Sequence, residues 1–182
     1  RIITTDEKLA RRAALELESQ IRQGITTAIV GQDGFNPIPI PEFFKELEKK
    51  PELINFATFS GHGTVREEVM GKDFERLASP AEIEKMAKLV EKDMKAGAIG
   101  LSTGLEYDPG HYSNTEELIS LTKVAAQYGG MYISHVRDEG NGALKSFDEL
   151  LDIARATGKI QMHAAGVFPF SPASRQSNKV AG

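Results

Sequence analysis

The chain has 182 residues, a length that allows one globular domain with a sizeable core. Of these residues 40% are hydrophobic and 26% are charged, as is usual for a globular protein. Its net charge of −4 is spread along mixed acidic and basic stretches, which disfavours a nucleic-acid partner. No apolar run is long enough to cross a membrane, and no signal peptide opens the chain. Cysteine is absent, so disulfides and thiolate metal sites are excluded, and we expect a cytoplasmic protein whose metal ligands, if any, are histidine and carboxylates.

The first third of the chain predicts two helices and two strands. Apolar side chains at four-residue spacing indicate a helix over residues 6–23, which Gly24 ends. Residues 25–30 are rich in β-branched side chains and indicate a buried strand. Pro41 can start a helix over residues 42–49, and residues 53–59 form a second expected strand. The loops that follow these strands carry Asp33 and the run Gly61-His62-Gly63-Thr64.

The rest of the chain repeats the order strand, loop and helix. Helices are expected over residues 65–70, 80–95, 114–128 and 143–156, and strands over residues 98–101, 131–134 and 160–163. The helix that begins near residue 80 carries a capping box from Ser79 to Glu82. In the last helix, the side chains expected to face the core are Leu144, Phe147, Leu150, Leu151 and Ala154.

This alternation predicts an α/β fold with parallel strands and right-handed crossovers. Two architectures remain open: a doubly wound open sheet, or part of a (β/α)8 barrel, which needs eight units and roughly 250 residues. The chain has about five such units, too few to close a barrel. Residues 164–182 show no period and are expected to form an irregular tail.

Unusual polar residues gather after the predicted strands, where a parallel sheet brings them to one edge. His135 and His163 each end a strand about one unit apart, so neighbouring strands could bring both to one metal ion. The alternative is that both are buried and hydrogen-bonded near the sheet edge. His62, between two glycines, is as compatible with a loop residue bonded to backbone as with a ligand.

Two further residues of these loops have a functional and a structural interpretation. Arg137 could bind a substrate carboxylate, or it could pair with Asp138, Glu139 or Glu106. Tyr107 could polarise a carbonyl group, or it could simply pack with its hydroxyl hydrogen-bonded.

Several motifs together resemble one enzyme family. They are residues 20–34, Gly61-His62-Gly63-Thr64-Val65-Arg66, residues 97–112 and Tyr132-Ile133-Ser134-His135-Val136-Arg137-Asp138-Glu139-Gly140. In this order they resemble the N-acyl-D-amino-acid deacylase (D-aminoacylase) branch of the amidohydrolase superfamily, over roughly residues 17–163.

The resemblance implies a zinc-dependent hydrolase, on a distorted (β/α)8 barrel, that cleaves the amide of an N-acylated D-amino acid. It implies zinc ligands at His135, at His163 and at Asp33, which stands where the family often has cysteine. It places Tyr107 at the substrate carbonyl, where it matches the family tyrosine. We expect His62, Arg66 and Arg137 to be the substrate-binding residues.

The chain also departs from the family pattern. It has no His-x-His strand and no general-base aspartate on a last barrel strand, and Ala165 stands where a lysine is usual. We therefore expect residues 1–163 to be a central part of a barrel, about strands two to six, followed by the tail. The alternative is a catalytically inactive fragment or an oligomeric binding module of the same fold, with self-association through open sheet edges.

Overall fold

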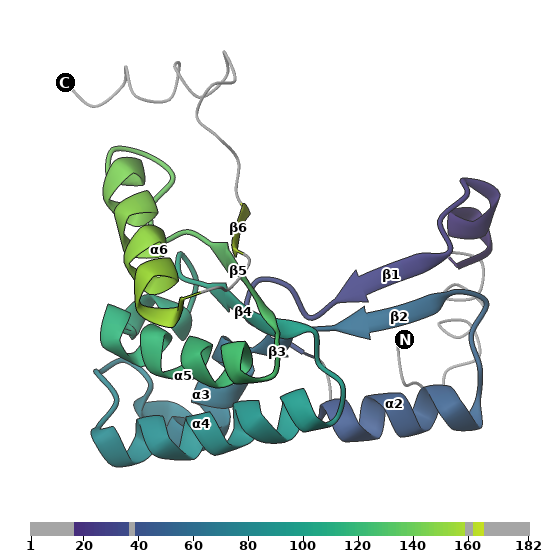
Figure 1. The fold of residues 1–182 in the computed structure, drawn as a ribbon, viewed down its shortest axis with the longest axis horizontal. Coiled ribbons are helices and arrows are strands. Elements are labelled where there is room, and N and C mark those ends of the chain that lie inside the picture. The colour runs from purple at the N-terminus through teal and green to yellow at the C-terminus, as the bar shows by residue number, and fades with distance from the viewer. Residues whose placement is uncertain (1–16, 37–38, 159–161, 166–182) are drawn as a thin grey trace.

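A computed structural model describes residues 17–36, 39–158 and 162–165 of the chain (Figure 1). Within these residues the fold is α/β and the paired strands are parallel, as expected. One sheet pairs β1 with β2, and the other has the order β3-β4-β5-β6. The strands are β1 (Thr27–Val30), β2 (Asn55–Thr58), β3 (Ser60–Gly61), β4 (Gly100–Gly104), β5 (Met131–His135) and β6 (Met162–Ala165).

The two sheets are joined by a change of strand partner at Phe59. The Phe59 amide donates to the carbonyl of Val30 at 3.1 Å, which continues the pairing with β1. The Ile99 amide donates to the carbonyl of Thr58 at 2.9 Å, which begins the pairing with β4. The single strand expected over residues 53–59 is therefore two short strands, and it links the β1–β2 arm to the larger sheet (Figure 1).

Helices follow most of the strands along the chain, and those that come after β3 and β4 pack against the four-stranded sheet (Figure 1). They are α2 (Ile40–Lys49), α3 (His62–Met70), α4 (Pro80–Lys95), α5 (Thr115–Gln127) and α6 (Ala143–Thr157), with 3-10 turns η1 (Gly71–Asp73) and η2 (Gly110–Tyr112). The capping box is confirmed, because the Ser79 amide donates to Glu82 and the Glu82 amide donates back to Ser79 Oγ. Asn114 caps α5 in a similar way by accepting from the Glu117 amide at 3.0 Å.

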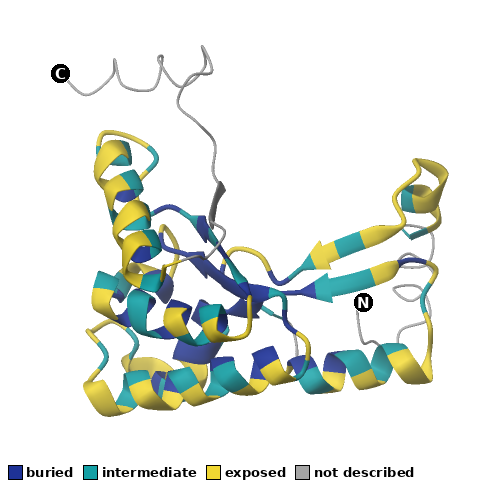
Figure 2. Cartoon of the chain, viewed as in Figure 1, coloured by how far each residue is buried: buried dark blue, intermediate teal, exposed yellow. Residues whose placement is uncertain are grey.

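The core lies between α4, α5 and the central strands (Figure 2). Every residue of β4 is buried, as expected for the central strand of a sheet that helices cover. Met86 and Val90 of α4 and Leu118 and Leu121 of α5 are completely buried. The buried side chains of each helix thus lie three or four residues apart, on the side that faces the core.

The inward face predicted for α6 is partly wrong. Leu144 is 81% exposed and Leu151 is 49% exposed, whereas Ile153 is completely buried and Ser146 is buried. Ser146 and Ile153 lie seven residues apart on one side of the helix, and that side faces the protein. Leu144 and Leu151 share another side, because packing against α5, rather than side-chain hydrophobicity, selects the buried side.

Several segment boundaries also differ from expectation, such as that of β4, which was expected over residues 98–101 and is Gly100–Gly104. Residues 62–64 are the first turn of α3 rather than a loop. β6 extends to Ala165, two residues into the expected tail, while residues 166–182 lie outside the described part of the chain. Of the helix expected over residues 6–23, the structure describes residues 17–22 as helical.

Among the described residues, no helix has the length and apolar character that a membrane span requires.

Candidate metal centre at the strand ends

Five polar side chains meet at the carboxyl ends of the strands. Asp33 follows β1, Glu106 and Tyr107 follow β4, His135 ends β5, and Glu139 follows it. We call these five residues the His135 cluster. The edge at which they meet is where parallel α/β folds place functional groups.

Asp33 is positioned by a tight turn that packs onto β4. The Ser102 hydroxyl of β4 donates to the carbonyl of Gly31 at 2.5 Å and accepts from the amide of Gly34 at 3.2 Å. A side chain at Gly104 would collide with the carbonyl oxygen of Asp33, so glycine is needed for this close approach. Asp33 itself has a φ of 55°, in the left-handed region that aspartate tolerates better than most residues.

His135 is the centre of the cluster. Its Nε2 lies 2.7 Å from Glu139 Oε1 and 3.1 Å from Glu106 Oε2, and its Nδ1 lies 3.7 Å from Asp33 Oδ1. The His135 side chain is 13% exposed, whereas those of Asp33 and Glu106 are about half exposed. One imidazole is thus surrounded by three carboxylates at the surface of the protein.

Tyr107 lies against the same imidazole. Its hydroxyl is 3.2 Å from Nε2 and 3.3 Å from Nδ1 of His135, and the two rings meet edge to face at 4.8 Å. Desolvation raises the pKa of Tyr107, and the negative charges of Glu106, Asp33 and Glu139 raise it further. The hydroxyl therefore keeps its proton at neutral pH and can donate a hydrogen bond.

The donor set of this cluster fits a divalent metal ion. Glu106, His135 and Glu139 each offer one ligand atom, and these atoms all lie within 4.8 Å of one another. Zinc accepts imidazole nitrogen and carboxylate oxygen, and catalytic zinc sites combine three protein ligands with an open position. Three carboxylates exceed the charge that one imidazole can neutralise, so a bound cation would balance the cluster.

Of the ligands predicted from sequence, the structure brings Asp33 and His135 together. The third, His163, lies in β6, where its backbone pairs with Ile133, two residues before His135 on the neighbouring strand. The side chain of His163 lies outside the described part of the chain, so its ligand role stays a prediction.

His62 and Arg66 lie away from this cluster, in the interior. Both side chains are completely buried beside Glu117 of α5. His62 Nε2 lies 2.8 Å from Glu117 Oε1, and Arg66 Nη1 donates to Glu117 Oε2 at 2.5 Å. We call these three residues the buried triad. The expected contact with substrate is not what the structure shows, because the two side chains are enclosed and bonded within the protein.

The buried triad also explains the ionisation of its carboxylate. Burial by itself would raise the pKa of Glu117, but the hydrogen bonds and positive charges of His62 and Arg66 lower it overall. Glu117 therefore stays ionised inside the protein, where it holds α5 against α3.

Arg137 forms an ion pair, but with a partner that the sequence did not indicate. Its Nε and Nη2 each donate to one oxygen of Glu149 in α6, both at 3.0 Å. Its Nη1 donates to the carbonyl of His111 at 2.7 Å. The expected partners were Asp138, Glu139 or Glu106, and the expected function was substrate binding.

Sequence reasoning did not name Glu106 and Glu139 as candidate ligands and considered them only as partners of Arg137. Their positions directly after β4 and β5 are the signal that could have identified them, because both loops lead to the same edge. Glu117 and Glu149 lie within helices, where a charged residue usually faces water, so no sequence pattern indicates their ion pairs with Arg66 and Arg137.

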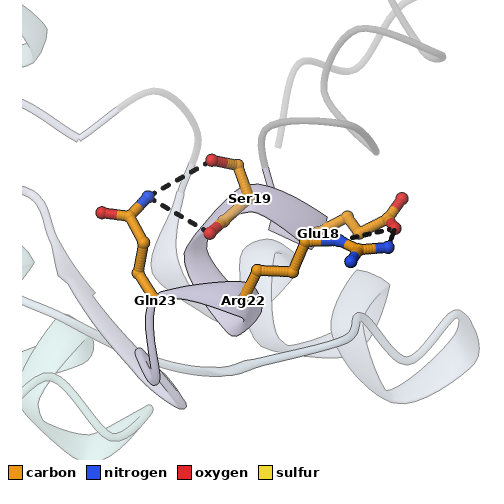
Figure 3. A pocket seen from close by; sticks show the side chains of 4 residues that line it. All are labelled: Glu18, Ser19, Arg22 and Gln23. Carbon is orange, nitrogen blue, oxygen red and sulfur yellow. Dashed lines mark hydrogen bonds and ion pairs between the residues drawn. The ribbon is translucent and has the colours of Figure 1, made fainter.

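A surface pocket lies apart from the cluster, at the helical turn of residues 17–22 (Figure 3). Its lining side chains bond to one another. Arg22 pairs with Glu18 at 2.6 Å, and Gln23 Nε2 donates to the carbonyl of Ser19 at 3.2 Å. These polar groups are exposed and already partnered, so this pocket does not compete with the strand ends as a candidate site.

Comparison with known proteins confirms the resemblance drawn from the motifs. No family model matches the chain. D-aminoacylase of Alcaligenes xylosoxydans xylosoxydans is 32% identical over 173 residues, covering 82% of this chain and 35% of that protein. N-acyl-D-glutamate deacylase of the same organism is 34% identical over 164 residues, covering 78% of this chain and 33% of that protein. The chain thus spans about a third of the length of these curated relatives.

Solved structures agree with the sequence comparison. N-acyl-D-glutamate deacylase from Bordetella bronchiseptica, complexed with zinc and a phosphonate inhibitor, matches with a TM-score of 0.77 and 31% identity, over 81% of this chain and 35% of that one. A D-aminoacylase described as defining a novel subset of amidohydrolases matches with a TM-score of 0.76 and 28% identity, over 88% of this chain and 40% of that one.

Proposed function

This chain is a homologue of D-aminoacylase and the N-acyl-D-amino-acid deacylases, and we propose that it forms part of the catalytic domain of a zinc-dependent hydrolase. The substrate class that we propose is an N-acylated D-amino acid, cleaved at its amide bond. The observation that carries this proposal is the His135 cluster, where one imidazole and three carboxylates meet at the strand ends beside a protonated tyrosine.

We assign metal binding to His135 with Asp33, Glu106 and Glu139, and we keep His163 as a candidate on the neighbouring strand. When bound, zinc supplies Lewis-acid polarisation of the substrate carbonyl and lowers the pKa of a water molecule. Aspartate in place of the family's cysteine gives this site oxygen and nitrogen donors among its described residues, which suits zinc and also manganese.

Tyr107 has the second role. Its hydroxyl points to the same imidazole and keeps its proton, so it can donate a hydrogen bond to the oxygen of the scissile carbonyl. Negative charge grows on that oxygen as the amide is attacked, so this hydrogen bond would be stronger in the transition state than in the substrate complex. Loss of one such donor typically costs about 100-fold to 1,000-fold in kcat.

For the architecture, we propose that the parallel strands belong to a (β/α)8 barrel, with a barrel domain that runs through β6 to Ala165 and an irregular tail after it. Two features support a larger assembly of strands. Among the described residues β1 pairs with β2 alone and β6 pairs with β5 alone, so each has an edge on which a further strand could pair. Leu144 and Leu151 present an exposed apolar side of α6 that a further helix could cover.

The experiment that tests this function combines metal content with catalysis. Purified protein is dialysed and its zinc is measured by plasma mass spectrometry, and hydrolysis of N-acetyl-D-amino acids is then assayed with the L-enantiomers as control. We expect about one zinc per chain. Because the chain has no general-base aspartate, we expect slow turnover that prefers the D-substrates and is lost in Tyr107→Phe.

Two results would count against the proposal in different ways. Stoichiometric zinc without any hydrolysis would support the alternative of an inactive binding module of the same fold. Absence of zinc together with a molecular mass well above that of one chain, measured by light scattering, would indicate association through the open sheet edges instead.

A further inference from the structure

The segment between β4 and α5, residues 105–114, carries two of the five groups of the His135 cluster. Glu106 and Tyr107 stand near its start, and η2 stands near its end. The two parts are bonded to each other, because the His111 amide donates to the carbonyl of Tyr107 at 2.8 Å. The position of Tyr107 therefore depends on what holds η2.

One anchor of this segment is Arg137. The guanidinium uses Nη1 for the carbonyl of His111 at 2.7 Å, and it uses Nε and Nη2 for the two oxygens of Glu149 at 3.0 Å each. Glu149 also accepts from the Thr115 hydroxyl at the start of α5, at 2.9 Å. These hydrogen bonds join the segment that follows β5 to α5, to α6 and to η2.

A second anchor reaches η2 from the interior. Arg66 of the buried triad donates to the carbonyls of Phe74 and Arg76 through Nη2, and the same atom lies 3.4 Å from the carbonyl of Tyr112. This last contact is long, so the shorter contact from Arg137 to His111 is the stronger of the two anchors. The Ser113 hydroxyl also donates to the carbonyl of Gly110 at 2.7 Å, which keeps η2 compact.

We propose that Arg137 and Glu149 are positioning residues, which hold Tyr107 and Glu106 against His135 through η2. The alternative, that Arg137 binds a substrate carboxylate, requires a free guanidinium. In the structure the charge of Arg137 is neutralised by a bidentate pair with Glu149, and its remaining contact is a backbone carbonyl. The structural part of this proposal stands by itself, and its effect on turnover rests on the proposed deacylase function.

Backbone hydrogen exchange of residues 105–113, followed by mass spectrometry, tests the structural part without any need for activity. Arg137→Lys keeps the positive charge but cannot contact Glu149 twice and His111 at the same time. Glu149→Gln keeps the shape but removes the charge that orients Arg137. For both variants we expect exchange in this segment to rise about tenfold, as for the loss of one charge-assisted hydrogen bond, with exchange in β4 and β5 unchanged.

Arg155→Lys is the matched control, because Arg155 pairs with Asp152 on the same helix at 2.9 Å, but with both side chains exposed. We expect wild-type exchange for this variant. Unchanged exchange of residues 105–113 in both Arg137→Lys and Glu149→Gln would overturn the proposal.

Kinetics separate positioning from substrate binding in active protein. Positioning predicts that Arg137→Lys and Glu149→Gln both lower kcat with little change in KM, because each displaces Tyr107. A rise in KM for Arg137→Lys with unchanged exchange, and no rise for Glu149→Gln, would instead make Arg137 a substrate ligand. If the protein has no deacylase activity, the proposed function fails while the exchange result still decides the positioning role.

Discussion

The buried triad and the His135 cluster use the same chemistry in opposite ways. In the triad, one carboxylate meets an imidazole and a guanidinium, all three completely buried, and its charge is fully compensated. In the cluster, one imidazole meets three carboxylates, two of them about half exposed. Compensated, enclosed charge fixes structure, whereas uncompensated charge open to solvent is suited to a cation that arrives from outside.

The largest effect is expected from breaking the triad. Glu117→Ala leaves the Arg66 guanidinium buried without its carboxylate, so we expect the free energy of unfolding to fall by about 3 to 5 kcal/mol. Urea denaturation followed by circular dichroism measures this loss. Glu84→Ala is the control, since Glu84 forms an exposed pair with Lys88, and it should cost less than about 0.5 kcal/mol. A similarly small loss for Glu117→Ala would mean that the triad does not hold α3 and α5 together.

The same triad predicts how stability depends on acid. The folded pKa of Glu117 lies below its ordinary value, so its contribution is present above the unfolded pKa and is lost as pH falls through the folded pKa. Wild-type protein should therefore lose stability on acidification below the ordinary glutamate range, and Glu117→Gln should lose less over the same pH range. If the free energy of unfolding fell equally with pH in the two proteins, Glu117 would not be the group responsible for this loss.

Mutation of the His135 cluster should change the affinity for metal rather than the stability of the fold. His135→Ala removes the central ligand, and we expect zinc affinity to fall by at least about 100-fold, since even the loss of an outer partner of a ligand typically costs 10- to 100-fold. Isothermal titration calorimetry measures this change. His111→Ala, which changes an exposed histidine, should bind zinc like wild type. Equal affinity in the two variants would place the metal elsewhere.

A buried tyrosine of β5, Tyr132, gives a smaller effect, in alkali. Burial raises the pKa of Tyr132 to about 12, while the unfolded tyrosine ionises near 10. The contribution of Tyr132 to stability should therefore be present below pH 10 and should be lost, by about 2 kcal/mol, as pH rises through the folded pKa. Tyr132→Phe should lack this part of the decline, although it loses the 2.9 Å contact with Thr103. Tyr128→Phe, at an exposed tyrosine, should keep the decline.

The smallest effect concerns the N-terminal cap of α4. Ser79→Ala removes the side-chain cap of α4, and we expect a loss of about 1 kcal/mol in thermal or urea unfolding. Lys88→Ala on the exposed side of the same helix should change stability by less than about 0.5 kcal/mol. A loss above that of Glu117→Ala would reverse the order of importance proposed above.

Local and periodic features were determined by the sequence itself. The capping box at Ser79 depends on a neighbour three residues away, so a local pattern identifies it. Alternation of strands and helices was sufficient to predict parallel pairing. The motifs were sufficient to identify the relatives and to bring Asp33, Tyr107 and His135 into one hypothesis.

Partners that are distant in sequence were decided by the tertiary structure alone. Glu117 meets Arg66 from 51 residues away, and Glu149 meets Arg137 from another element, so neither pair leaves a local pattern. The exposed side of α6 was likewise settled by how the helix packs against its neighbours. The sequence does not show whether a charged side chain lies in water, at a metal ion or beside a buried partner, because packing between elements decides its surroundings.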